Sequence, residues 1–572
     1  MHLWLALAAL CLYDPFPVAY AESSPNKSKK VYTQAEVAQH NSPEKGVWVM
    51  YGSKVYDVTS FVEHHPGGDK ILLGAGKRIE PFWSLYAFHK TPEVFAILEK
   101  YYIGEVELTT VDKKLDNSNP YANDPERHPA LIINIETPFN AEMPTELLVD
   151  HLITPNELFF VRNHLPVPQM DRDSYKLEIR DFGFERKLQL NLDQIKKFPA
   201  KEVITTIQCA GNRRKDMQDA SAKPGQVDIN IQGIPWKHTA LSTAKWKGVP
   251  LLDIMYAMLH PWQFKAGLKP NAYLLIKELE ARGVCSYKIF NYQTQFCSEL
   301  GLVEYNSVKF NYFEQQVRHI QFQGADGDPT IGSYGASIPI GMALDPHSEV
   351  ILAYEMNGKE IPLDHGFPLR VIIPGTIGAR QVKWLTNISL SDRESDSFWQ
   401  QKDYKFVPPQ ALKSCDMTKI PAVLGFPVQS AICVPKAGQK LVNDGSIIVK
   451  GYALSGYGRG ILSVEVSVDG GTTWHTASLD SASPPTSDSS EDGNTVEGTL
   501  DATNRSFRQW AWTLWQVEVP IDRSLTQVEL ICKARDSANG TQPAGFEGSY
   551  NVRGLLANAW HRVKVDLTPE ES

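Results

Sequence analysis

Residues 61–68 read Phe-Val-Glu-His-His-Pro-Gly-Gly, and this stretch decides the expected fold of the N-terminal part of the chain. Proline restricts the backbone after His65, and the two glycines let it turn tightly around a flat group. A second histidine, His89, follows in an apolar run that contains Phe82 and Phe88. Taken singly, each histidine would be an ordinary surface residue. Two imidazoles that converge in an apolar pocket can instead hold an iron porphyrin on both faces, which predicts an electron carrier.

The sequence on either side of this stretch predicts paired strands. Residues 47–51 and 54–58 are rich in β-branched and aromatic side chains, and a glycine-containing turn separates them. Together with the His-Pro-Gly-Gly motif, they resemble the cytochrome b5 family over residues 31–107. The resemblance implies an α+β domain in which His65 and His89 are the two axial ligands of a b-type haem.

A second informative stretch, Thr-Ile-Gln-Cys-Ala-Gly-Asn-Arg-Arg at residues 206–214, lies in the middle of the chain. An apolar strand delivers the thiol of Cys209 to a turn that contains a glycine and is followed at once by two arginines. Cationic neighbours favour the thiolate form of a cysteine, and a thiolate is a soft metal ligand. On these grounds alone, a buried and unreactive cysteine is the alternative.

Four further motifs occur in the order found in the sulfite oxidase family, which the chain resembles over nearly its whole length. They are Phe-Phe-Val-Arg-Asn-His-Leu-Pro at 159–166, Tyr-Gly-Ala-Ser at 334–337, Asp-His-Gly-Phe-Pro-Leu-Arg at 364–370 and Gly-Ala-Arg-Gln-Val-Lys-Trp at 378–384. The resemblance implies that Cys209 binds molybdenum, the other ligands coming from a molybdopterin and two oxygens. It also implies that the cofactor is held by Phe160, Val161, Arg162, Asn163, His164, Asp326, His365, Arg370, Gln381, Val382 and Lys383.

By the same resemblance, the chain is expected to oxidise sulfite to sulfate. The implied pocket combines anion-binding arginines, an aromatic wall and a hydroxyl beside the metal, from Arg162, Arg214, Arg553, Trp236 and Tyr404. Two electrons are then expected to leave one at a time through the haem to an external acceptor, which is cytochrome c in animal members of the family. Rigid cationic donors suit such a small oxyanion.

Bulk composition sets the number of domains and limits the partners. A chain of 572 residues is too long for one hydrophobic core, and its formal charge of −9 argues against a nucleic-acid partner. From residue 442 onward, period-two alternation and an Asp-Gly-Gly turn predict an immunoglobulin-like β-sandwich. The expected organisation is a leader at 1–30, a cytochrome b5-like α+β domain at 31–107, a flexible linker at 108–127, a mixed α/β molybdopterin domain at 128–395, and a β-sandwich at 396–572 through which the chain forms a homodimer.

Two segments stand apart from this organisation. Residues 3–10 form an apolar run that is too short to span a bilayer, so no stable membrane insertion is expected. The run resembles a targeting segment, which favours the mitochondrial intermembrane space, with secretion as the alternative. A segment at about 260–315, which contains Cys285 and Cys297, does not align with the family and receives no role.

Two other functions fit parts of the sequence. A nitrate reductase shares the cofactor domains, but in that family the haem domain follows the molybdenum domain and a flavin and nicotinamide module completes the chain. Here the haem motif comes first, and no Gly-rich dinucleotide-binding region precedes Ser572. A non-catalytic haem carrier has no need for Cys209 beside arginines. Sulfite oxidation is therefore the predicted function.

Overall fold

The computed structural model describes residues 30–84, 89, 91–107, 120–180, 187–222, 230–259, 317–328, 331–409, 416–481 and 508–569. The expected leader and the unaligned segment at about 260–315, with its two cysteines, lie outside these residues. The described residues form two compact units, which divide between Lys113 and Lys114. None of the described helices is long and apolar enough to cross a membrane.

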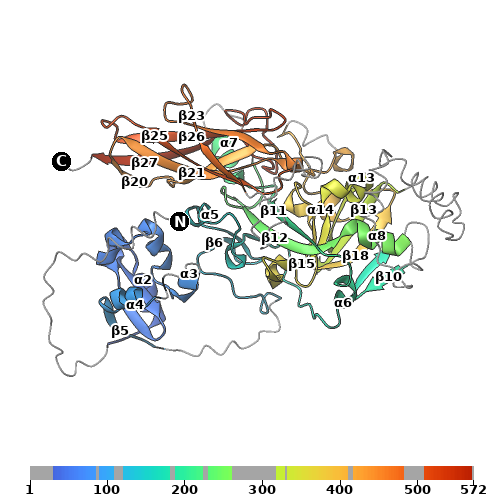
Figure 1. Ribbon diagram of the computed structural model, residues 1–572, viewed down its shortest axis with the longest axis horizontal. Coiled ribbons are helices and arrows are strands. Elements are labelled where there is room, and N and C mark those ends of the chain that lie inside the picture. The colour runs from blue at the N-terminus through green and yellow to red at the C-terminus, as the bar shows by residue number, and fades with distance from the viewer. Residues whose placement is uncertain are drawn as a thin grey trace, which may run out of the picture. The chain divides into compact units, whose positions relative to one another are not determined.

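The smaller unit is a five-stranded sheet with short helices (Figure 1, blue). In sheet order its strands are β1 (Val31–Tyr32), β5 (Tyr102–Val106), β4 (Lys54–Asp57), β3 (Gly46–Tyr51) and β2 (Asn41–Ser42). Its helical segments are α2 (Gln34–Gln39), α3 (Glu80–Ser84), α4 (Pro92–Glu99) and the 3-10 segments Thr59–His64 and Gly68–Gly74. The sheet and these segments enclose an apolar core that includes Val47, Val58, Ile79 and Trp83. The expected α+β domain is confirmed.

The hairpin predicted around the glycine turn forms as expected. Strands β3 and β4 pair antiparallel, from Trp48 opposite Asp57 to Tyr51 opposite Lys54. Helix α2 begins where the sequence provides a capping box, because Thr33 and Glu36 satisfy each other's backbone amides. Local sequence therefore accounts for the elements that precede the haem motif.

The first half of the larger unit contains three sheets joined by short helices (Figure 1). In sheet order, the strands of the first sheet are β6 (Ile132–Ile135), β7 (Asn140–Glu142) and β8 (Val161–Arg162). Those of the second sheet are β10 (Lys187–Leu190), β9 (Leu177–Arg180), β18 (Leu385–Ser391), β13 (His319–Asp328) and β14 (Gly332–Pro339). Those of the third sheet are β11 (Lys201–Gln208), β12 (Leu241–Pro250), β15 (Ile351–Met356) and β16 (Lys359–Glu360), and β17 (Arg370–Ile372) pairs with β15. The described helices are α5 (Thr145–Leu148), α6 (Leu192–Ile195), α7 (Arg214–Ser221), α8 (Leu251–Leu259), α13 (Ile340–Leu344) and α14 (Phe398–Gln401).

The second half of the larger unit is the predicted β-sandwich (Figure 1, orange to red). One sheet orders β19 (Gln429–Val434), β21 (Ser446–Leu454), β25 (Thr513–Pro520) and β24 (Ser478–Ser481); the other orders β20 (Lys440–Asn443), β27 (His561–Pro569), β26 (Gln527–Asp536), β22 (Ile461–Ser467) and β23 (His475–Thr476). Alternate residues of both sheets, such as Val464, Val466 and Val449, fill one shared core. The multidomain class predicted from the sequence is thus confirmed.

The predicted linker extends too far at its C-terminal end. Residues 120–127 belong to the larger unit, where Arg127 pairs with Asp364 and with Asp124, each at 2.8 Å. The guanidinium group of Arg127 also lies 4.2 Å from the centre of the Phe139 ring. The sequence of residues 120–127 is polar and therefore resembles a linker. It does not reveal the ion pair of Arg127 with Asp364, because Asp364 lies far away along the chain.

Candidate active site

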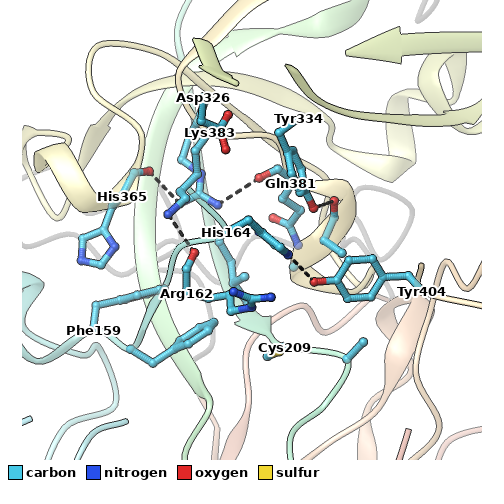
Figure 2. Close-up of a pocket in the computed structure, with 16 residues that line it drawn as sticks. Phe159, Arg162, His164, Cys209, Asp326, Tyr334, His365, Gln381, Lys383 and Tyr404 are labelled. Atoms are coloured by element: carbon cyan, nitrogen blue, oxygen red, sulfur yellow. Dashed lines mark hydrogen bonds between the residues drawn. The ribbon is translucent and has the colours of Figure 1, made fainter. Parts of the chain in front are cut away.

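One pocket of the larger unit gathers most of the residues predicted to hold a cofactor (Figure 2). Its open space, part of which faces solvent, is about 650 Å³. The predicted residues that line it are Phe160, Arg162, His164, Cys209, Asp326, His365, Arg370, Gln381, Lys383 and Tyr404. These residues come from separate loops and strand ends, so folding brings together motifs that are far apart in the sequence.

Other predicted residues stand behind the pocket wall. Val161 is buried in a cluster with Phe139, and Trp236 is fully buried in the core beside Cys209. The side chain of Asn163 donates to Asp364 (2.8 Å). Four predicted cofactor or wall residues do not line this pocket: Val161, Asn163, Trp236 and Val382. The role of Trp236 as a wall of the substrate pocket stays a prediction.

Two of the three predicted anion-binding arginines, Arg214 and Arg553, do not line this pocket, and their role stays a prediction. Arg214 donates from Nε to the carbonyl of Arg553 (2.7 Å) and from Nη1 to the carbonyl of Ile234 (2.7 Å). Arg553 pairs with Asp403 at 2.8 Å, and its side chain is 36% exposed. Arg553 Nε is buried and has no hydrogen-bond partner among the described residues. Arg162 is the predicted anion-pocket arginine that does line the pocket.

Cys209 lies at the end of a strand in the third sheet. Strand β11 pairs with β12 up to Gln208, opposite Leu241, so Cys209 is the first residue of the following loop. The thiol is free and the side chain is 6% exposed. Figure 2 shows Cys209 at the bottom of the pocket, on the same side as Arg162 and Tyr404. This position makes the thiol available to a group bound in the pocket.

Lys383 is the centre of a polar network at the end of the pocket opposite Cys209 (Figure 2). Its ammonium group donates to the carbonyls of Arg162 (3.0 Å) and Asp364 (2.7 Å), and it also donates to the side chain of Asn163. Burial lowers the pKa of Lys383 and raises that of Asp326. The network holds cationic groups inside a largely apolar unit, where they can meet an anionic ligand.

The Asp364→Asn variant is expected to lose about 2 kcal/mol of stability at pH 7, because the change removes one of the two carboxylates that pair with the half-buried Arg127 and leaves Asp124 as the other. Burial raises the pKa of Asp364, but the hydrogen bonds and charge of Arg127 outweigh burial and hold the pKa below its usual value. A lowered pKa contributes stability above the unfolded-state value of about 4, and this contribution is lost as the pH falls through the folded-state value. Urea unfolding of both proteins tests this expectation. A gap in unfolding free energy that fails to narrow below about pH 4 contradicts it.

His164 and Tyr404 form a pair beside Cys209. A hydrogen bond of 2.7 Å joins His164 Nε2 to the hydroxyl of Tyr404 (Figure 2). Burial holds the pKa of His164 well below its usual value and raises that of Tyr404 to about 12. Both groups are therefore neutral at physiological pH, and the histidine fixes the direction of the phenol hydroxyl. Tyr404 has a positive φ of 41°, which is uncommon for a residue other than glycine.

The pocket has unused hydrogen-bonding capacity that fits a polar, anionic cofactor. Asp326 Oδ1 and Arg370 Nε are buried, and neither has a hydrogen-bond partner among the described residues. Buried polar atoms are normally satisfied, so such atoms in a pocket indicate a bound ligand. Asp326 can accept from a pterin ring, and Arg370 can bind phosphate. With the thiol of Cys209, these donors and acceptors fit a molybdopterin cofactor.

The smaller unit presents two histidines that fit an iron porphyrin. The imidazole rings of His65 and His89 are 6.3 Å apart between centres and 2° from parallel. This separation leaves room for one metal ion between the rings. It equals two metal–nitrogen bonds of about 2 Å each plus the distance from each ligating nitrogen to the centre of its own ring. His65 Nδ1 is hydrogen-bonded to the carbonyl of Gly68 (3.1 Å), which leaves Nε2 for the metal. Trp83 stacks on His89, 5.4 Å away between ring centres and 10° from parallel.

Comparisons with known families agree with both sites. A cytochrome b5-like haem/steroid-binding domain matches residues 33–107, an oxidoreductase molybdopterin-binding domain matches 164–399, and a molybdenum-cofactor oxidoreductase dimerisation domain matches 421–568. The chain is therefore a molybdenum-dependent oxidoreductase with a cytochrome b5-type haem domain, and its cofactors are a molybdenum–molybdopterin and a b-type haem.

Full-length relatives define the family. The chain is 40% identical to the mitochondrial sulfite oxidase of Homo sapiens over 570 residues, which cover 99% of this chain and 89% of that protein. It is 42% identical to the sulfite oxidase of Gallus gallus over 536 residues, or 93% and 99% of the two chains. A nitrate reductase of Phaseolus vulgaris is 31% identical over 445 residues, which cover 75% of this chain but 41% of that protein. The chain belongs to the sulfite oxidase family.

The structure also adds residues that the sequence had not assigned a role. Tyr334 lines the pocket and donates its hydroxyl proton to the carbonyl of Ala379 (2.7 Å), while Phe159 packs edge-on against His365. Both residues lie within motifs that were recognised, so membership of a motif was the available signal. Arg127 carried no such signal, because nothing near it in sequence indicates its pairing with Asp364.

Proposed function

We propose that the larger unit oxidises sulfite to sulfate in the pocket around Cys209, and that the electrons leave through a haem held by His65 and His89. The observation that carries this proposal is the convergence of a thiol, a guanidinium group and a phenol hydroxyl, from Cys209, Arg162 and Tyr404, in one pocket. A thiolate ligand and a cationic group for an oxyanion are what this reaction requires of a protein. The bound molybdenum supplies oxygen-atom transfer and takes up two electrons, which the haem carries one at a time.

Arg162 is the residue best placed to bind the anion. Its Nη1 donates to the side-chain oxygen of Asn140 (3.1 Å) and to the carbonyl of Asn163 (2.6 Å). These bonds fix the plane of the guanidinium group and leave its other nitrogens for a ligand. The partner groups are neutral, so the positive charge is not cancelled by a carboxylate. We propose that Arg162 binds the oxygens of sulfite.

The Arg162→Met variant is expected to raise the KM for sulfite by about tenfold to a hundredfold, because it removes charge-assisted hydrogen bonds to the anion. Steady-state kinetics over a range of sulfite concentrations measures this change. The control is Arg172→Met, which alters an arginine on the surface of the same unit, 45% exposed and outside the pocket. An unchanged KM in Arg162→Met would mean that another group binds the substrate.

His164 and Tyr404 are proposed to hold the hydroxyl that faces the substrate. Burial lowers the pKa of His164, so its imidazole stays neutral. The reaction consumes one water and releases two protons for each sulfite, and those protons must leave through hydrogen-bonded groups. Tyr404 Oη, bonded to His164 Nε2, is the first such group in the pocket.

We further propose the surroundings in which this chain works. Relatives named as mitochondrial sulfite oxidases support a mitochondrial location, and the apolar N-terminal run supports the intermembrane space. Cytochrome c is the proposed electron acceptor there. The match to a dimerisation domain supports a homodimer formed through the β-sandwich.

Sulfite-dependent reduction of cytochrome c by the purified chain tests the proposal. With both cofactors present, sulfite is expected to reduce cytochrome c, and sulfate is expected to accumulate at half the number of electrons transferred. Nitrate is the substrate to compare, because a nitrate reductase shares part of this sequence. Consumption of nitrate by the reduced chain, without any oxidation of sulfite, would overturn the assignment.

A further inference from the structure

The loop that carries Cys209 is closed by three hydrogen bonds. The amide of Cys209 donates to the carbonyl of Ala240 (2.9 Å), and the amide of Ala240 donates to the side-chain oxygen of Asn212 (3.1 Å). The amide of Asn212 in turn donates to the carbonyl of Cys209 (3.0 Å). The position of Cys209 therefore depends directly on the side chain of Asn212.

Tyr452 anchors this ring from a different part of the fold. It lies on strand β21 of the β-sandwich and is fully buried. Its hydroxyl accepts a hydrogen bond from Asn212 Nδ2 (3.1 Å) and donates one to the carbonyl of His238 (2.6 Å). The hydroxyl of Tyr452 thus joins Asn212, on the Cys209 loop, to His238, which lies shortly before Ala240.

The β-sandwich half also holds the neighbouring residues of this loop. The amide of Leu556 donates to the carbonyl of Ala210 (2.8 Å), and Arg213 Nη1 donates to the carbonyl of Ala559 (2.6 Å). The side chain of Arg213 is 1% exposed, although it has a positive φ of 63°. A buried arginine that reaches across to backbone carbonyls fixes two parts of a fold against each other.

We propose that Tyr452 is a positioning residue for the Cys209 thiol, so that the β-sandwich sets the place of the molybdenum ligand in addition to forming the dimer. This inference rests on the proposed role of Cys209 as that ligand. Removing the hydroxyl leaves a buried amide and a buried carbonyl without partners. Such a loss shifts a local opening equilibrium by about tenfold.

The first test is the rate at which iodoacetamide alkylates Cys209 in the full-length chain prepared without molybdopterin. The Tyr452→Phe variant is expected to react about tenfold faster at Cys209, as measured by peptide mass spectrometry. The matched control is Tyr175→Phe, because Tyr175 is also buried in the larger unit and donates its hydroxyl proton to a carbonyl, that of Leu385 (2.5 Å). The control is expected to leave the rate at Cys209 unchanged.

A second variant approaches the same contact from the loop side. Asn212→Ala is expected to speed alkylation at least as much as Tyr452→Phe, and adding Tyr452→Phe to it is expected to change the rate little. An unchanged rate in Tyr452→Phe, or equal increases in Tyr452→Phe and Tyr175→Phe, would overturn the positioning role. Equal increases in the two variants would show a general loss of stability.

A spectroscopic measurement separates this inference from the proposed function. In the chain loaded with both cofactors, Tyr452→Phe is expected to change the Mo(V) electron paramagnetic resonance signal and to lower kcat, with little change in the KM for sulfite. Tyr175→Phe is expected to leave the signal as in the wild type. Faster alkylation with an unaltered Mo(V) signal would overturn the role of Cys209 as ligand, which is a failure of the proposed function.

Discussion

Cys209→Ala is expected to lose sulfite-dependent reduction of cytochrome c by more than about a hundredfold, because a change to a residue that merely supports a metal ligand already costs about 10- to 100-fold. The thiol is the soft ligand that the pocket provides, and it lies beside Arg162 and Tyr404. Alanine is smaller than cysteine and the side chain is buried, so the surrounding backbone is expected to keep its conformation. Steady-state assays of equal amounts of haem-loaded protein measure the loss.

Two controls make the result of the Cys209→Ala variant specific. The haem absorption spectrum is expected to match that of the wild type, because the haem site lies in the other unit. Cys532→Ala is the matched substitution, since Cys532 is also a free, buried cysteine but lies in the β-sandwich core. Activity retained by Cys209→Ala in protein that contains molybdenum would refute the ligand role of this residue.

His89→Ala is the second variant with a large expected effect. Removing one axial ligand is expected to lower haem occupancy and to reduce sulfite-dependent reduction of cytochrome c by more than about a hundredfold. The pocket around Cys209 is untouched, so a small dye that accepts electrons directly from the larger unit is still expected to be reduced by sulfite. The ratio of the two activities is the quantity to measure.

The neighbouring histidine provides the control for this variant. His64 is exposed and precedes His65 in the same motif, whereas His65 and His89 have facing, parallel rings. His64→Ala is therefore expected to keep both activities and a normal haem spectrum. If His89→Ala lost dye reduction as severely as reduction of cytochrome c, the separation of the two redox sites would be wrong.

Local patterns in the sequence predicted the parts of the fold that depend on neighbouring residues. The β3–β4 hairpin followed from two β-rich runs around a glycine turn, and the sandwich followed from period-two alternation. The parallel pairing of β9 with β18 had no such signal, because these strands are separated by most of the molybdopterin-binding half. Such pairings are decided by tertiary packing, which local sequence does not encode.

Motif identity was a good guide to the pocket but not to the direction of each side chain. Arg162 and Lys383 line the pocket. Arg553 forms a salt bridge with Asp403, the residue that precedes Tyr404 in the chain. Whether an arginine faces a pocket or a neighbouring carboxylate depends on distances of a few ångströms, which a sequence motif does not specify.

The most direct test of the account is to add sulfite, without any external acceptor and without oxygen, to the full-length chain loaded with both cofactors. Electrons released at the pocket around Cys209 then have the haem held by His65 and His89 as their destination. The account predicts that the haem spectrum changes from the oxidised to the reduced form in the wild type and stays oxidised in Cys209→Ala. A haem that stays oxidised in fully loaded wild-type protein would contradict the claim that this chain oxidises sulfite and passes the electrons to its haem.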